Sequence, residues 1–317
     1  MNLLIFLTHP EPTRSGYEKY LKPRHPELSI TTVGTRDEAL ALAPDADILM
    51  AFGPQVRTDF FRHTPKLKWV HSLGTGTDGI SDSPFLGKDV IVTATRGIHG
   101  APISELAFLQ MLAFARDFRR IERQREAKRW ERHPGMLLAE KTVGIVGVGA
   151  IAEGLSLRCK AFGMRVVGIS RTNRAIAGFD KIYSRAEIAR AAAELDYVVL
   201  LVPLQDDTRN IVDARVLAAM RPTAFLINLA RGGVLDEVAL IAALKEKKIA
   251  GAALDALATE PLPADNPLWS MPNVIVTPHI GGYYDDYPRD AARQFEQSLA
   301  HFVAGTTELM LNREPRT

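Results

Sequence analysis

Residues 142–170 read TVGIVGVGAIAEGLSLRCKAFGMRVVGIS, and this stretch decides the fold. A short apolar run leads into a glycine-rich turn, then a segment with apolar residues at helical spacing, then a second apolar run. This order, within about 30 residues, is typical of a βαβ unit that binds a dinucleotide. Gly147 permits the tight turn, and Gly149 lets a pyrophosphate approach the backbone N–H groups of the helix N-terminus. The alternative is a glycine turn with a purely structural role. The second strand follows at the spacing expected of a dinucleotide-binding unit, which disfavours this alternative.

Two positions in this unit depart from the usual pattern. Ala152 stands where a third glycine is common, and it is small enough for close packing of helix on strand. Ser170 stands where an Asp or Glu would bind the ribose hydroxyls of NAD. Followed by Arg171, it predicts a preference for NADP(H), because a guanidinium can bind a 2′-phosphate with paired hydrogen bonds. If these residues are only a solvent-facing loop, NAD(H) is used instead, so NAD(H) stays possible.

Short apolar runs alternate with helical patterns on both sides of this unit, which indicates parallel sheets with crossover helices. The chain of 317 residues is long enough for two domains. Its 46% hydrophobic and 24% charged residues are typical of a globular protein, and a net charge of +2 gives no reason to expect a nucleic-acid partner. Further strands are predicted at residues 3–7, 28–33, 46–52, 67–73, 90–94, 197–203, 224–230, 251–257 and 273–278.

Amphipathic helices are predicted from Pro102 to Arg120 and over residues 289–305. Between them, residues 121–135 read IERQREAKRWERHPG, in which acidic and basic side chains are interleaved. This pattern favours a solvated helix or a loop that contacts another subunit over a nucleic-acid patch.

Cysteine usage and the N-terminus bear on the cellular compartment. The single cysteine, Cys159, excludes an intramolecular disulfide and fits a reducing compartment, and its spacing places it on the buried face of a helix. The opening residues MNLLIFLTHP carry too short an apolar run for a signal peptide and lack a preceding positive charge. Nothing approaches the roughly 20 apolar residues of a membrane span. We therefore expect a cytoplasmic protein without membrane contacts.

Three polar residues of the second half each follow an apolar run and lie close to Gly or Pro: Arg231 in NLARGG, Glu260 in ATEPLP and His279 in TPHIGG. This placement is typical of the carboxyl ends of buried parallel strands, where open α/β sheets bind their ligands. A cation, a carboxylate and an imidazole together can hold an anionic substrate and move a proton. Each residue alone has a structural alternative, and their coincidence beside a dinucleotide unit favours catalysis. The other histidines lack metal-ligand spacing, so no metal is expected.

The chain resembles the D-isomer-specific 2-hydroxyacid dehydrogenase family over nearly its whole length, and is most similar to the glyoxylate/hydroxypyruvate reductase branch. The motifs that carry the resemblance are, in order, GVGAIA, LLVPLQDDTRNIV, INLARGGVLDE, ALDALATEPLPADNPLW and PNVIVTPHIGG. It implies an α/β fold of two domains: a Rossmann-type parallel-sheet nucleotide domain at residues 101–282, and a flavodoxin-like substrate domain at residues 1–100 completed by residues 283–317. It also implies a homodimer with contacts from residues 101–140, and hydride transfer between NADPH or NADH and a small 2-oxo acid.

The resemblance also implies a role for each site residue. Arg231 would bind the carboxylate and carbonyl oxygen of the 2-oxo acid, His279 would donate a proton to that oxygen, and Glu260 would orient the imidazole. The amides of Thr75 and Gly76 would hold the substrate carboxylate. Cofactor contacts are implied at Ile103, Gly147, Gly149, Ala150, Ile151, Ser170, Arg171, Thr172, Val202, Pro203, Thr208, Leu229, Ala230, Asp255 and Gly281.

Two departures from the family pattern leave the identity of the 2-oxo acid open. The usual GAGVD motif is altered to GTGTD at residues 74–78, and three tyrosines follow His279 within GGYYDDY. Tyr283, Tyr284 and Tyr287 could fill a core or line the substrate pocket. Two other functions also stay open: a dinucleotide-sensing binding protein on the same scaffold, and oxidation of another small anion such as phosphite.

Overall fold

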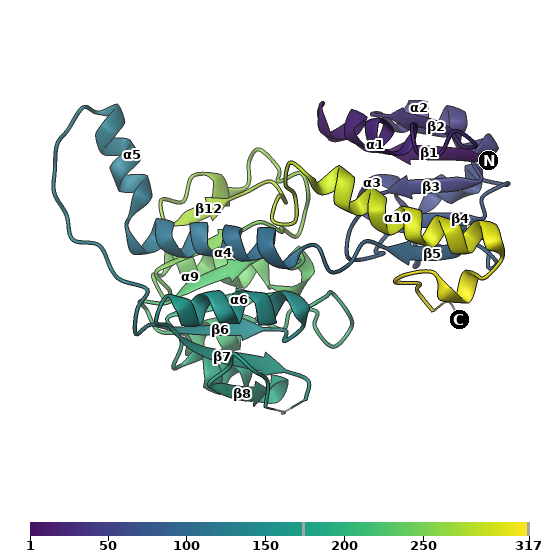
Figure 1. The fold of residues 1–317 in the computed structure, drawn as a ribbon. Helices are drawn as coiled ribbons and strands as arrows, with labels where there is room; N and C mark the ends of the chain where they lie inside the picture. The colour runs from purple at the N-terminus through teal and green to yellow at the C-terminus, as the bar shows by residue number, and fades with distance from the viewer. Residues whose placement is uncertain (173–174, 316–317) are drawn as a thin grey trace. The chain divides into compact units, whose positions relative to one another are not determined.

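The computed structural model describes residues 1–172 and 175–315, and it divides the chain into two compact units. Unit 1 comprises Met1–Ile98 and Tyr284–Thr317, and unit 2 comprises His99–Tyr283. The chain therefore passes between the units twice (Figure 1). None of the described helices is both long enough and apolar enough to cross a membrane.

Unit 1 contains, in its described residues, a five-stranded parallel sheet with the strand order β2-β1-β3-β4-β5. This is the flavodoxin-like order, in agreement with the fold that the family resemblance implied. The strands are β1 (Asn2–Phe6), β2 (Ser29–Val33), β3 (Ile48–Ala51), β4 (Trp69–Ser72) and β5 (Ile91–Ala94). The helices are α1 (Thr13–Leu21), α2 (Arg36–Leu42), α3 (Gly53–Val56) and, from the end of the chain, α10 (Tyr287–Ala304).

Helix α10 completes the core of unit 1. Its apolar residues Ala291, Phe295 and Leu299 are almost fully buried in one cluster with Trp69 of β4. The rings of Trp69 and Phe295 stack with their centroids 4.7 Å apart. Figure 1 shows α10 running along the sheet, and α1 packs beside it. One side of this sheet is therefore covered by a helix from the far end of the sequence.

Unit 2 contains, among its described residues, a seven-stranded parallel sheet with the order β12-β11-β10-β9-β6-β7-β8. The order reverses between β6 and β9, which is the Rossmann arrangement and confirms the predicted nucleotide-binding fold. The strands are β6 (Thr142–Val146), β7 (Arg165–Ser170), β8 (Lys181–Ser184), β9 (Tyr197–Leu200), β10 (Phe225–Asn228), β11 (Gly251–Leu254) and β12 (Val274–Val276). The helices are α4 (Gly100–Ala115), α5 (Phe118–Glu126), α6 (Ala150–Ala161), α7 (Ile188–Ala192), α8 (Ala214–Ala219) and α9 (Glu237–Lys245).

The central strands of unit 2 are covered on both faces. Every residue of β6, β9 and β11 is buried. A strand buried on both faces needs apolar side chains at every position, so its sequence is a continuous apolar run without alternation. That is why these strands could be predicted from short runs such as YVVL and GAAL.

The single helix predicted from Pro102 to Arg120 is wrong. Helix α4 ends at Ala115, and α5 starts only after Asp117, whose φ of 46° is left-handed. Asp tolerates this conformation better than most residues, and it turns the chain out of the first helix. The strand β8 was not predicted, because its residues KIYS lie at a sheet edge and carry few apolar side chains.

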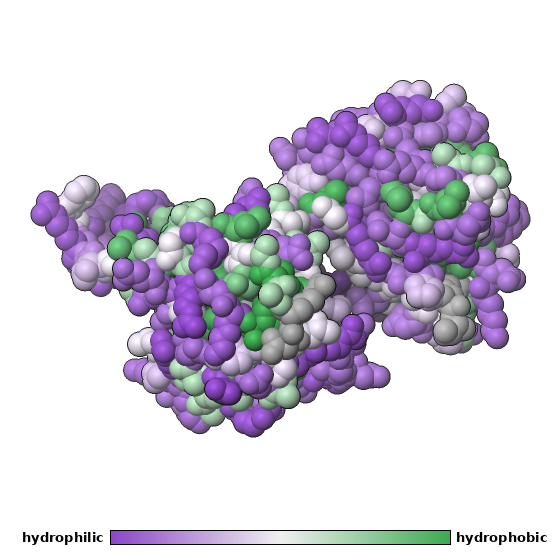
Figure 2. Space-filling view, turned by 60° about the horizontal axis from the view of Figure 1, so that its bottom comes forward, coloured by the Kyte–Doolittle hydropathy of each residue, from purple (hydrophilic) through white to green (hydrophobic). Residues whose placement is uncertain are grey.

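Apolar side chains are exposed on α4, on α5 and on the segment that follows. Figure 1 shows α5 extending away from the sheet of unit 2, and Figure 2 shows green hydrophobic residues interrupting the purple surface of this unit. Trp130 is 92% exposed and Leu137 71%. The other exposed apolar residues of these segments are Leu109, Leu112, Phe118, Ile121 and Met136.

Candidate active site

Arg231, Glu260 and His279 lie past the carboxyl ends of three adjacent strands of unit 2. Arg231 follows β10, Glu260 lies in the loop after β11, and His279 follows β12. Since the strands are parallel neighbours, the structure brings all three residues to one edge of the sheet. This is the edge at which open α/β sheets bind their ligands.

Glu260 and His279 form a direct pair. His279 Nδ1 lies 2.8 Å from Glu260 Oε2, and the other carboxylate oxygen accepts the N–H of Leu257 at 2.9 Å. Burial alone would raise the pKa of Glu260, but the hydrogen bond and charge of His279, the Leu257 N–H and the charge of Arg231 together bring this pKa below its usual value. Glu260 is therefore ionised at neutral pH. With Nδ1 bound to this carboxylate, Nε2 is the ring nitrogen that can face a substrate.

Asp255 holds the loop that carries His279. Its carboxylate accepts hydrogen bonds from Thr277 Oγ1 at 2.6 Å, Ile280 N at 2.9 Å and Gly281 N at 2.8 Å. These bonds lie on both sides of His279, whose φ of 55° is left-handed. Such a conformation is uncommon outside glycine and persists where the surroundings impose it. Asp255 therefore fixes the backbone from which the imidazole projects.

The backbone of Arg231 is held by a residue that the sequence pattern did not single out. Asn228, which is fully buried, donates from Nδ2 to the Arg231 carbonyl at 3.0 Å. His99, at the start of α4, is also buried, and burial together with the charge of Arg231 lowers the pKa of His99 to about 4. His99 is therefore neutral at pH 7. An amide at the end of the apolar run FLIN was the available signal for Asn228.

The glycine turn after β6 fits the pyrophosphate of a dinucleotide. Gly147 has a φ of 100°, and a Cβ there would lie 2.8 Å from the backbone nitrogen of Val202, so the packing of the chain itself requires glycine. Gly149 differs, because its φ of −133° suits any residue and a Cβ would meet no described atom within 4 Å. Gly149 caps the N-terminus of α6, whose first N–H groups have no partner within the helix. The space beside Gly149 suits an anion bound by these groups.

The loop after β7 carries the residues expected to select the cofactor. Ser170 ends the strand, and the Thr172 N–H donates to its hydroxyl at 3.4 Å. Arg171 and Thr172 are exposed. Residues 170–172 therefore offer two hydroxyls and a guanidinium, without a carboxylate. Asn173 and Arg174 lie outside the described residues.

The remaining cofactor positions lie elsewhere in unit 2. Thr208 is fully buried, donates its hydroxyl to the Pro203 carbonyl at 2.6 Å and accepts the Gln205 N–H at 2.7 Å. It therefore shapes the loop after β9. The others lie just past β9 and β10 or in the first turns of α4 and α6: Val202, Pro203, Leu229, Ala230, Ile103, Ala150 and Ile151.

Residues from unit 1 form a separate group. Thr75 and Gly76 lie in the loop after β4, so the structure does not bring them into the same unit as Arg231. Tyr287 is buried in the core of unit 1, and the Tyr284 hydroxyl donates to Asp290 at 2.9 Å. Both tyrosines thus have structural contacts within unit 1.

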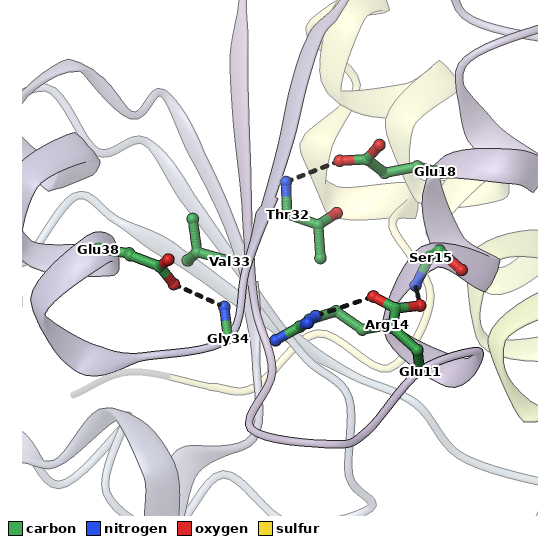
Figure 3. Close-up of a pocket in the computed structure, with 8 residues that line it drawn as sticks. All are labelled: Glu11, Arg14, Ser15, Glu18, Thr32, Val33, Gly34 and Glu38. Carbon is green, nitrogen blue, oxygen red and sulfur yellow. Dashed lines mark hydrogen bonds and ion pairs between the residues drawn. The ribbon is translucent and has the colours of Figure 1, made fainter.

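A cavity of about 240 Å³ in unit 1 lies among the loop after β1, the start of α1 and the end of β2 (Figure 3). Glu11 accepts hydrogen bonds from Arg14 Nε at 3.0 Å and from the Ser15 N–H at 3.1 Å. Glu38 accepts the Gly34 N–H at 3.1 Å. These carboxylates hold the local chain, and none of the residues predicted for the site lines this cavity.

Residues 108–281 match the NAD binding domain of the D-isomer specific 2-hydroxyacid dehydrogenases. The chain is 34% identical over 286 residues to the D-3-phosphoglycerate dehydrogenase of Methanocaldococcus jannaschii, covering 88% of this chain and 54% of that longer protein. It is also 34% identical over 280 residues to the glyoxylate reductase of Pyrococcus furiosus, covering 85% of this chain and 83% of the relative.

A solved structure is similar over almost the whole chain. The NADPH-dependent glyoxylate/hydroxypyruvate reductase of Sinorhizobium meliloti, in complex with NADP and sulfate, matches with a TM-score of 0.82 and 27% identity, covering 96% of this chain and 95% of that one. These similarities agree with the motif order and with the two parallel sheets. The chain therefore belongs to the D-isomer specific 2-hydroxyacid dehydrogenase family of oxidoreductases.

Proposed function

We propose that this chain reduces a small 2-oxo acid to the 2-hydroxy acid, and that Arg231, Glu260 and His279 carry the reaction. The observation that supports this proposal is the 2.8 Å pair between His279 and Glu260, at the same sheet edge as Arg231. The Glu260 carboxylate holds Nδ1 and so orients the ring, and reduction of a carbonyl needs a positioned proton donor.

Each residue then has a defined task. Arg231 binds the anionic substrate, because its planar guanidinium matches two oxygens at once. His279 donates the proton on Nε2 to the carbonyl oxygen, while Glu260 keeps the ring in one orientation before and after the transfer. Backbone N–H groups of Thr75 and Gly76 bind the substrate carboxylate. A bound reduced nicotinamide dinucleotide supplies the hydride.

NADPH is the cofactor that the loop after β7 favours. Ser170 carries no negative charge and the exposed Arg171 carries a positive one, which suits a 2′-phosphate. A carboxylate at position 170 would repel this phosphate. The Sinorhizobium meliloti relative is NADPH-dependent, which supports the same choice. NADH is then the less efficient reductant.

Glyoxylate and hydroxypyruvate are the first substrates to test. The Pyrococcus furiosus relative is a glyoxylate reductase, and the Sinorhizobium meliloti relative is a glyoxylate/hydroxypyruvate reductase. Both compounds are small 2-oxo acids whose carboxylate and carbonyl oxygens suit the guanidinium of Arg231.

We propose that the protein works in the cytoplasm as a homodimer. Cys159 is fully buried in α6, and burial raises the pKa of its thiol to about 12, so this cysteine has a packing role and fits a reducing compartment. The apolar side chains exposed on α4, α5 and the segment after α5 support a subunit contact.

The test is a panel of 2-oxo acids, each assayed with NADPH and NADH by the loss of nicotinamide absorbance. His279→Ala should lower kcat by about 100-fold or more, since a positioned proton donor is typically worth that factor. Arg231→Ala should lower kcat and raise KM together. The exposed His63 of unit 1 provides a matched control, His63→Ala, which should leave both constants unchanged.

Two outcomes would contradict the proposal. Undiminished reduction by the His279→Ala protein would exclude the proton-donor role. Tight binding of NADPH without turnover of any 2-oxo acid would favour the dinucleotide-sensing alternative.

A further inference from the structure

The loop after β4, which holds Thr75 and Gly76, has its carbonyl oxygens occupied by side chains of unit 1. The Ser72 hydroxyl donates to the Gly76 carbonyl at 2.7 Å, and the Tyr287 hydroxyl donates to the Leu73 carbonyl. Arg96 Nε donates to the Thr75 carbonyl at 3.2 Å. A loop whose carbonyls are held in this way keeps its negative dipole ends away from a bound anion.

The hydrogen bond from Arg96 to the Thr75 carbonyl also fixes the direction of the Gly76 N–H. In a planar trans peptide, the carbonyl of one residue and the N–H of the next point in opposite directions. A hydrogen bond that fixes the Thr75 carbonyl therefore also fixes the Gly76 N–H, and aims it away from Arg96. This is the N–H to which the proposed function assigns the substrate carboxylate.

Arg96 is itself held on both its backbone and its side chain. Gln294 of α10 accepts the Arg96 N–H at 3.1 Å and donates to the Arg96 carbonyl at 2.6 Å. The guanidinium forms an ion pair with Glu314 in the C-terminal tail. The Glu314 side chain is 19% exposed and that of Arg96 41%, so this pair lies at the surface with its carboxylate partly shielded from water.

The tail that carries Glu314 is attached to the edge of the sheet. The Glu314 N–H donates to the Val92 carbonyl at 2.9 Å, and the Ala94 N–H donates to the Asn312 carbonyl at 3.2 Å. Thr93 and Arg313 form an antiparallel bridge between these bonds. The tail thus runs beside β5 as a short extra strand and places Glu314 next to Arg96.

We propose that Arg96 is a positioning residue for the substrate carboxylate, and that residues 312–314 act as a strap that keeps its guanidinium on the Thr75 carbonyl. The inference rests on the proposed function, which places the substrate carboxylate at Thr75 and Gly76. Arg96 acts through the peptide plane and does not touch the substrate.

The first test compares Arg96→Ala with the unmodified protein. KM for glyoxylate should rise about tenfold, because one aimed hydrogen bond to the carboxylate is lost, while kcat changes less than about threefold. The Kd for NADPH should stay the same. Arg24→Ala is the matched control: it removes another ion pair of unit 1, with Glu296 at 2.8 Å, and should change none of these constants.

Exchanging the two charges distinguishes the effect of the ion pair with Glu314 from the effect of the hydrogen bond to the Thr75 carbonyl. The double variant Arg96→Glu, Glu314→Arg restores an ion pair and should recover the thermal stability lost by Arg96→Ala. KM should stay raised, because a glutamate has no donor for the Thr75 carbonyl. A normal KM in this double variant would overturn the inference. If Arg96→Ala does not fold, Glu314→Ala is measured instead and should raise KM about threefold.

Binding of oxalate, a carboxylate that is not turned over, distinguishes this inference from the proposed function. The protein saturated with NADPH is titrated with oxalate by calorimetry. Weaker binding to Arg96→Ala than to Arg24→Ala supports the inference even if the choice of 2-oxo acid is wrong. Equal binding to both variants overturns it, whereas failure of the unmodified protein to reduce any 2-oxo acid counts against the proposed function.

Discussion

At the scale of single residues, Ser170 and Arg171 should decide which cofactor is used. Arg171→Ala should raise KM for NADPH by about ten- to a hundredfold, because a charge-assisted contact to the 2′-phosphate is worth roughly 1.5–3 kcal/mol. KM for NADH should hardly change. Ser170→Asp should reverse the preference, since the new carboxylate repels the phosphate and accepts hydrogen bonds from the ribose.

The measurement is kcat/KM for both cofactors with one 2-oxo acid. Arg190→Ala serves as a control, because Arg190 lies in the same unit and its side chain is 74% exposed. Equal kcat/KM for NADPH and NADH in the unmodified enzyme would show that the loop after β7 does not select the cofactor.

The sequence predicts some site residues better than others, for a physical reason. Arg231, Glu260 and His279 are conspicuous because each polar side chain interrupts an apolar run beside Gly or Pro. Arg96 carries no such local signal, since its partners Gln294 and Glu314 are about 200 residues further along the chain. Its role depends on a bond to a backbone carbonyl, and side-chain patterns do not report such bonds.

At the scale of elements, β4 and β5 are joined by a buried chain of hydrogen bonds. Trp69 Nε1 donates to Thr93 Oγ1 at 2.8 Å, so the Thr93 hydroxyl can donate its own hydrogen to His71 Nδ1, also at 2.8 Å. The His71 proton then sits on Nε2, which donates to Thr95 Oγ1 at 3.0 Å, and that hydroxyl donates to the Ser72 carbonyl. The directions follow from the Ser72 carbonyl, which can only accept: the Thr95 hydroxyl donates its one hydrogen there, so it accepts from His71 Nε2, and Nδ1 of the neutral ring accepts from Thr93.

This chain of bonds predicts a loss of stability in mild acid. Burial lowers the pKa of His71 to about 3, below the 6.5 of the unfolded chain. As the pH falls from 6.5 towards 3, only the unfolded chain gains a proton, so the folded state loses about 1.4 kcal/mol per pH unit. Above pH 6.5 this contribution is constant. The His71→Gln protein lacks this titrating group. The difference in free energy of unfolding between the unmodified protein and His71→Gln should therefore become about 2 kcal/mol smaller from pH 7 to pH 5.

The experiment is urea unfolding, followed by the fluorescence of Trp69 in a background that carries Trp130→Phe and Trp269→Phe. Trp69 is fully buried in unit 1, and the other two tryptophans belong to unit 2, so the signal reports unit 1 alone. A deficit that is the same at both pH values would contradict the neutral, buried state of His71.

Most elements could be predicted because their burial is uniform. Strands buried on both faces have continuous apolar sequences, and β6, β9 and β11 are examples. The break at Asp117 was missed because one left-handed residue leaves the apolar spacing of the helix nearly unchanged. The edge strand β8 was missed because it pairs along one side only and needs little apolar surface.

At the scale of the whole molecule, the exposed apolar residues around α4 and α5 predict a dimer. Sedimentation should give twice the chain mass of 34.9 kDa. A Leu109→Glu, Leu137→Glu variant should sediment as a monomer, because two charges would be buried without partners in the contact. These leucines are 62% and 71% exposed in the single chain.

Val238→Glu is the control for the dimer. Val238 is 80% exposed on α9 of the same unit, and its replacement should leave the mass unchanged. A monomer in the unmodified protein at micromolar concentration would exclude this contact.

The divided layout of unit 1 also has a consequence for the order in which a ribosome produces the molecule. The sheet of unit 1 emerges first, but α10, which covers Trp69 with Phe295, is translated only after all of unit 2. At 5–20 residues per second this delay is on the order of ten seconds or more. During that time the nascent sheet exposes an apolar face of the kind that chaperones bind. Unit 2 is continuous in the chain, so it can fold before unit 1 is complete. The sheet of unit 1 is translated earlier but lacks α10 until the end of synthesis.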